Sequence, residues 1–176
     1  MDVDFVADYL IAKGDKPNGE SLTQLGLQKL VYLCQGWHLA MADELLFREN
    51  IYAFKLGPVV RELRDRFGMY GKDPLPPYPL TDAERVLSPS AKQIINGVWE
   101  QYAHLHSSRL VDLTHEAGSP WDQIWHHKSH GGTKGKIIPP ALIREWFKRE
   151  LDEKLRPRKT PPRDLAGIFE KATRGL

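Results

Sequence analysis

The stretch LGLQKLVYLCQGWHLA, residues 25–40, carries apolar or small side chains on almost every face of a helix. Leu27, Leu30 and Trp37 fall on one apolar line with helical spacing, and small residues form a second strip beside it. A helix that is apolar on two faces belongs at the centre of a domain, where other elements cover both faces. We therefore predict that a helix over residues 23–43 is the central helix of the fold.

A narrow polar stripe interrupts this helix at Gln28, Tyr32 and Gln35. A buried polar group that finds no hydrogen bond costs about 1–3 kcal/mol, so these side chains need partners. They either anchor a hydrogen-bond network inside the protein or face a groove that receives another protein. The sequence leaves both alternatives open.

The rest of the chain predicts a mainly α fold, a single helical domain around the central helix with one small antiparallel β-hairpin. Two apolar runs, Leu45–Phe47 and Ile51–Phe54, flank a short polar turn and predict the hairpin at about residues 45–56. Gly57 ends the second run, and Pro58 suits the first turn of a new helix. Helices are predicted to begin near Asp2, Thr23, Pro58, Ser90, Ser107, Ser119 and Pro140, and Ile137–Ile138 is a candidate strand that could pair with the hairpin.

The charge distribution divides the chain into a body, residues 1–154, and a tail, residues 155–176. The tail holds six Lys or Arg residues and two Asp or Glu residues, a net charge of +4, so the body carries −2 of the formal total of +2. Prolines make the first part of the tail a linker. Beyond it, Leu165, Ile168 and Phe169 predict a short amphipathic helix that either contacts a partner or docks on the body.

Composition restricts the class of protein. The chain has 176 residues and a single cysteine, which excludes an internal disulfide and indicates a reducing cytoplasm. No stretch approaches the roughly 20 apolar residues of a membrane span, and the start is too polar for a secretory signal. A net charge of +2 is too small to indicate nucleic acid binding, and acidic neighbours interrupt the Arg61 and Arg64 pair.

Histidines offer the only hint of catalysis. His115 and Glu116 form half of a zinc-protease motif, but the position of the second histidine is Ser119. His126, His127 and His130 lie in a Gly- and Lys-rich stretch that lacks the preorganised geometry a metal needs. We expect no metal and no cofactor, and keep a metal-dependent hydrolase that uses His115, Glu116 and these nearby histidines as the alternative function.

Several blocks, in order along the chain, are similar to one known family. SLTQLGLQKLVYLCQGWHLA, LLF, IYAFKLGPVVREL, YG and LTHEAGSPW resemble the SocA-like antitoxins, phage-associated proteins whose unit is the Panacea domain. The resemblance covers about residues 1–150. Phe54 stands where the family more often has tryptophan, Leu56 replaces an aromatic residue, and Thr114 replaces serine.

The resemblance implies a non-enzymatic, cytoplasmic bacterial protein that neutralises a cognate toxin by direct contact. It also implies that some members act as adaptors that deliver the toxin to an ATP-dependent protease such as ClpXP. The motif residues are Leu27, Leu30, Trp37, His38, Gly57, Pro58, His115, Glu116 and Trp121. The candidate partner-binding residues are Gln28, Tyr32, Gln35, Arg61, Arg64, Leu165, Ile168 and Phe169.

Overall fold

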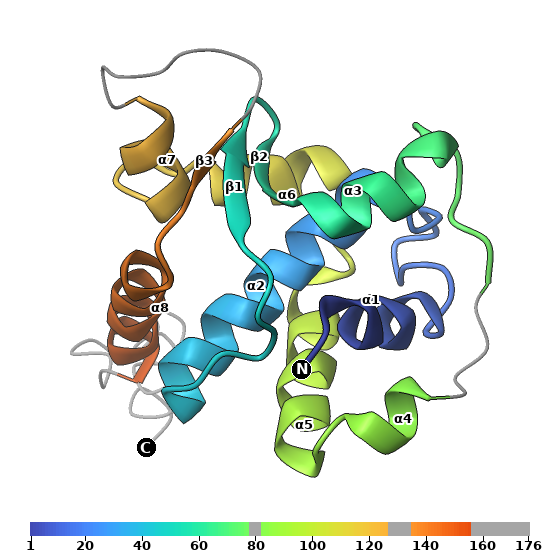
Figure 1. Ribbon diagram of the computed structural model, residues 1–176, viewed down its shortest axis with the longest axis horizontal. Helices are drawn as coiled ribbons and strands as arrows, with labels where there is room; N and C mark the ends of the chain where they lie inside the picture. Colours follow the sequence, from blue (N-terminus) through green and yellow to red (C-terminus); the bar gives the residue numbers. More distant parts are fainter. Residues whose placement is uncertain (78–81, 127–134, 156–176) are drawn as a thin grey trace, which may run out of the picture.

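The computed structural model describes residues 1–77, 82–126 and 135–155. Helix α2, Gln24–Ala42, runs through the middle of the molecule, with α8 (Pro140–Leu155) on one side and α1 (Val3–Ile11) and α5 (Pro89–Tyr102) on the other (Figure 1). The side chain of Thr23 caps the start of α2 by accepting from the amide of Gly26. All residues from 26 to 40 are buried, which confirms the predicted central helix.

The remaining helices are short, and all of them except η1 bury at least one apolar residue in the same core. In chain order they are α3 (Arg61–Phe67), the 3-10 helix η1 (Gly68–Tyr70), α4 (Ala83–Val86), α6 (Ser107–Thr114) and α7 (Pro120–Trp125). The side chain of Ser119 caps α7, as its sequence predicts, by accepting from the amide of Asp122. The single turn of α4 was not expected, because it follows a proline-rich stretch with no helical period. The fold is mainly α, and no helix in the described ranges is long and apolar enough to cross a bilayer.

A small antiparallel sheet completes the fold, but its hairpin lies further along the chain than the sequence predicts. Strand β1 is Ile51–Phe54, β2 is Gly57–Val60 and β3 is Lys136–Ile137, in the order β2-β1-β3. The prediction that Leu45–Phe47 forms the first strand is wrong. The prediction that the segment at Ile137–Ile138 pairs with the hairpin is confirmed, since β3 pairs with β1.

Two physical reasons shift the hairpin. Gln35 uses both ends of its side-chain amide on the backbone of residues 46 and 47, so that segment finds its hydrogen bonds without a partner strand. Pro58 lies in β2, not in the first turn of α3, because an edge strand tolerates a residue that has no N–H to donate. The chain therefore turns at residues 55–56, and α3 begins at Arg61.

Gly36 lets α8 approach α2 closely. A Cβ atom at position 36 would lie only 2.3–2.5 Å from three ring atoms of Phe147. The Phe147 ring is itself held edge-on between Tyr32 and Trp37, with centroid distances of 5.7 and 5.2 Å. The α2–α8 contact thus depends on the missing side chain at position 36.

We predict that Gly36→Ala destabilises the protein by about 2 kcal/mol, although alanine favours a helix by about 1 kcal/mol over glycine. Gly97→Ala in α5 is the matched control, because a Cβ atom there meets nothing within 4 Å. It should be neutral or slightly stabilising. Urea unfolding of both variants measures the difference, and equal stability of the two would contradict the role of Gly36.

Candidate functional site

Two polar side chains of α2, Gln28 and Lys29, lie where this helix meets the sheet. Gln28 donates from Nε2 to the carbonyl oxygen of Val60 at 3.0 Å and accepts from the amide of Val60 at 2.8 Å. The side chain therefore hydrogen-bonds both backbone groups of one residue on β2, as a neighbouring strand would. This arrangement closes the outer edge of the sheet with a helix side chain.

Lys29, the next residue, is fully buried and donates from Nζ to the carbonyl oxygen of Pro58 at 2.8 Å. Burial disfavours the charged ammonium group and lowers the pKa of Lys29 to about 7. Gly57, with φ of +99°, leaves the space for this amine, since a Cβ atom there would lie 2.9 Å from Nζ and 2.8 Å from Oγ1 of Thr114. The periodicity of α2 gave no reason to bury Lys29. The available signal is that it is the lone Lys, Arg, Asp or Glu of that helix.

His115 and Trp121 brace the other side of this region. Their rings are stacked, with centroids 3.6 Å apart and planes within 4°. Nε1 of Trp121 donates to the carbonyl oxygen of Phe54 at 2.8 Å, which ties α7 to β1. Burial lowers the pKa of His115, and the nearby charge of Lys29 lowers it further. His115 is therefore held neutral in a stacked position between helix and sheet.

The candidate metal ligands His115, Glu116 and His126 do not come together as a metal centre. Glu116 is exposed, and His126 interacts with Asp122 at the end of α7. His127 and His130 lie outside the described residues. Among residues 1–77, 82–126 and 135–155, no three His, Cys, Asp or Glu side chains come together as metal ligands would. The metal-dependent hydrolase gains no support from the structure.

The polar stripe of α2 is buried, so it does not form the exposed groove that was one of its two alternatives. Gln35 accepts from the amides of Leu46 and Phe47 and donates to the carbonyl oxygen of Phe47 at 3.1 Å. Tyr32 is 3 % exposed, and burial raises the pKa of its hydroxyl. Both glutamines anchor hydrogen bonds inside the protein, the first of the two alternatives, because their partners are backbone groups of the same chain. Gln28, Tyr32 and Gln35 were candidates for binding a partner, but the structure places all three inside the protein.

His38, a motif residue one turn after Gln35, joins the same internal set. Its Nδ1 lies 2.8 Å from the carbonyl oxygen of Glu44, and the side chain is buried. Cys34 is also fully buried, and burial raises the pKa of its thiol. Trp37 donates from Nε1 to the hydroxyl of Tyr102 at 3.2 Å. The central helix thus uses its polar groups to fix the elements around it.

The arginine candidates, in contrast, lie on the outer side of the sheet. The guanidinium of Arg61 lies 3.8 Å from the ring centroid of Tyr52, and that of Arg64 lies 5.1 Å from the ring centroid of Phe54. Leu56 at the hairpin turn is 54 % exposed. We call these residues, Tyr52, Phe54, Leu56, Arg61 and Arg64, the sheet face.

Arg66 and the three candidates of the tail have a different status. Arg66, on the same helix as Arg61, turns away and pairs with Asp4 and Asp8 of α1 at 2.8 and 2.7 Å, so it is part of the fold. Burial nevertheless raises the pKa of Asp8, because that carboxylate is partly removed from water. Leu165, Ile168 and Phe169 lie outside the described residues.

Comparison with known proteins agrees with this arrangement. Residues 27–122 match the family described as antitoxin SocA-like, Panacea domain, which is just over half of the chain. That range includes most of α2, the β1–β2 hairpin, the His115–Trp121 stack and their mutual hydrogen bonds. No curated protein and no solved structure matched the chain. The chain therefore belongs to the SocA-like antitoxin family and carries its Panacea domain.

Proposed function

We propose that this protein is an antitoxin that neutralises a cognate toxin in the cytoplasm by direct protein–protein contact, without an enzymatic step. The family match over residues 27–122 is the observation that carries the proposal. The geometry is compatible with it, because Gln28, Lys29 and Trp121 use their polar groups inside the fold, where they hold the hairpin in place. A rigid scaffold of this kind leaves its outer surface for association.

The sheet face is our candidate for the toxin-binding surface. Tyrosine and arginine are enriched among the residues that contribute most to binding at protein interfaces. Arg61 and Arg64 are already held over aromatic rings, so less side-chain freedom is lost when a partner binds. Lys55 and Leu56 at the exposed turn add a positive charge and an apolar group. Such a surface suits a partner that presents carboxylates around an apolar centre.

Co-expression of the protein with the product of the neighbouring gene tests the function. We expect the two to co-purify and the toxicity of that product to disappear. If they form no complex and toxicity persists, the antitoxin proposal is wrong.

Within the complex, Arg61→Ala combined with Arg64→Ala should weaken binding by at least about tenfold, because truncated arginine anchors commonly cost more than about 1 kcal/mol each. The matched control is Arg85→Ala combined with Arg109→Ala, two exposed arginines outside the sheet face that each pair with an aspartate three residues away. Titration calorimetry measures both. An intact complex whose affinity is unchanged by the first pair would reject the surface and leave the function standing.

Delivery to an ATP-dependent protease such as ClpXP is a further step of the same proposal. Toxin, antitoxin, purified protease and ATP are combined, and the amount of toxin is followed over time. Loss of toxin only when the antitoxin is present would support an adaptor role. A stable toxin that stays inactive would indicate that binding alone neutralises it.

A further inference from the structure

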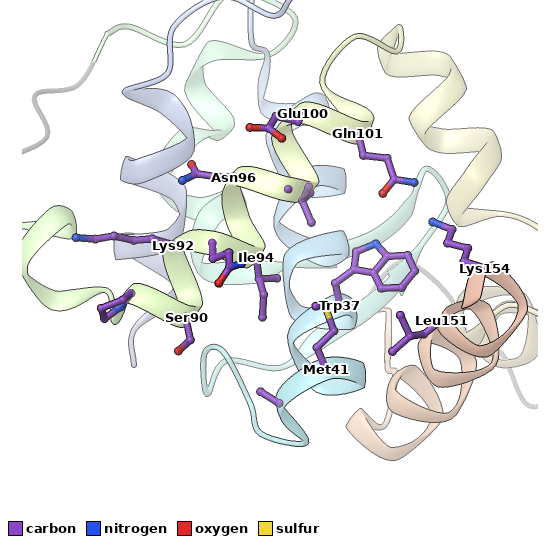
Figure 2. A pocket seen from close by; sticks show the side chains of 15 residues that line it. Trp37, Met41, Ser90, Lys92, Ile94, Asn96, Glu100, Gln101, Leu151 and Lys154 are labelled. Atoms are coloured by element: carbon purple, nitrogen blue, oxygen red, sulfur yellow. The ribbon is translucent and has the colours of Figure 1, made fainter. Parts of the chain in front are cut away.

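A groove lies on the side of the molecule away from the sheet, between the end of α2, α5 and α8. Its volume is about 970 Å³. Trp37 and Met41 of α2, Ile94 and Val98 of α5 and Leu151 of α8 supply apolar lining (Figure 2). Met41 is 61 % exposed. An exposed methionine beside a tryptophan and three aliphatic side chains forms a surface suited to the apolar side of a helix.

Charged side chains mark the rim of this groove. Lys92 and Glu100 come from α5, and Lys154 comes from the last turn of α8 (Figure 2). Nζ of Lys154 lies 4.3 Å from the ring centroid of Trp37 and 3.3 Å from the hydroxyl of Tyr102. The last turn of α8 therefore lies directly over the apolar floor.

The chain itself continues from this rim. Helix α8 ends at Leu155, one residue after Lys154, and 21 residues follow. Residues 156–163 include three prolines and can extend by at most about 28 Å. The next stretch, residues 164–172, has Leu165, Ile168 and Phe169 on one side of a predicted helix about 13 Å long. A short tether of this kind gives its end an effective concentration in the millimolar range at a nearby surface.

The charges of the segment also match the rim. Asp164 and Glu170 are negative and Lys171 is positive, while the rim has two lysines and one glutamate. We propose that residues 164–172 form an amphipathic helix that occupies this groove in the same chain. Leu165, Ile168 and Phe169 then cover Trp37, Met41 and Leu151, and the acidic ends of the segment lie toward Lys92 and Lys154.

A spin label on the tail of the full-length protein tests this proposal. The single cysteine, Cys34, is fully buried, so a nitroxide can be attached selectively to a new cysteine in the variant Thr173→Cys. Amide signals of Gln93, Gly97 and Gln101 on α5 should lose most of their intensity, while those of Arg109 and Asp112 on α6 should not.

Phe169→Asp should restore the α5 signals, because it places a charge against the apolar floor. Gly167→Asp is the matched control, since residue 167 lies on the opposite side of the predicted helix and its change should leave the broadening intact. On the groove side, Met41→Asp should restore the signals, and Met69→Asp, at a position 85 % exposed on η1, should not.

The result that overturns the proposal is an α5 spectrum unaffected by the label, or broadening that Phe169→Asp does not reduce. Binding of the tail to a second copy of the protein is tested with a mixture of two samples. One contains isotope-labelled chains without nitroxide, and the other contains unlabelled chains with nitroxide. Broadening of α5 in that mixture would show that the tail of a second copy fills the groove, and would also overturn the assignment to the same chain.

Discussion

Gly57→Ala is expected to destabilise the protein by more than about 3 kcal/mol, a large fraction of the roughly 5–15 kcal/mol that stabilises an ordinary domain. The backbone at Gly57 has φ of +99°, a conformation that a residue with a side chain rarely adopts. The added Cβ atom would lie 2.8 Å from Oγ1 of Thr114 and 2.9 Å from Nζ of Lys29. Both neighbours are buried, so neither can move into solvent to relieve the overlap.

Gly14→Ala separates the two causes of this loss. Gly14 has φ of +78°, and a Cβ atom there meets nothing within 4 Å. It should therefore show only the backbone strain, on the order of 1 kcal/mol. Chemical unfolding of both variants gives the comparison. If Gly57→Ala is no worse than Gly14→Ala, the contact of β2 with Lys29 and Thr114 is less tight than described.

Lys29→Met should abolish much of the dependence of stability on pH between about pH 7 and the ordinary lysine pKa of about 10.4. In the folded protein, burial lowers the pKa of Lys29 to about 7, so the amine is neutral above that pH. In the unfolded chain the same amine keeps its proton over this range. The unfolded state therefore binds more protons, and the free energy of unfolding rises with pH, by at most about 1.4 kcal/mol per pH unit.

Methionine cannot bind a proton, so this rise disappears in the variant. Relative to the parent protein, Lys29→Met should be most favourable below about pH 7, where the parent must bury a charge. It should be least favourable near about pH 10, where the variant has only lost the bond to Pro58. Urea unfolding at several pH values gives the slopes, with Lys72→Met, an exposed lysine, as the control. Parallel pH profiles for parent and Lys29→Met would contradict a neutral buried amine.

The central helix could be predicted from sequence because its evidence is local. The apolar period of residues 23–43 and the polar cap at Thr23 depend only on neighbours along the chain. The capped start of α7 at Ser119 could be predicted for the same reason.

The hairpin register required long-range information. Whether Leu45–Phe47 or residues 57–60 become the partner of β1 is decided by the side chain of Gln35 and by the edge position of Pro58. Neither appears in a hydrophobic pattern. The sequence could not predict whether the polar stripe is buried or exposed for a similar reason, because it does not show which segment covers Gln28 and Gln35.

Lys29 could not be placed because pattern reading takes lysine as a sign of the surface. Its burial depends on three positions far apart in sequence: the carbonyl group of Pro58, the empty side-chain position of Gly57 and the hydroxyl of Thr114. The resemblance to a known family includes these residues in separate blocks of sequence and does not indicate that they touch.

Five side chains that hold the elements around α2 form their hydrogen bonds to main-chain atoms and not to other side chains. They are Gln28, Lys29, Gln35, His38 and Trp121. Every amino acid supplies a carbonyl oxygen. The segments that accept these hydrogen bonds can therefore change most of their own side chains without losing them. The side chains of the hairpin turn and of the solvent-facing strand positions are therefore not needed to maintain the fold. A protein built in this way can acquire recognition of new targets through substitutions that leave its framework undisturbed.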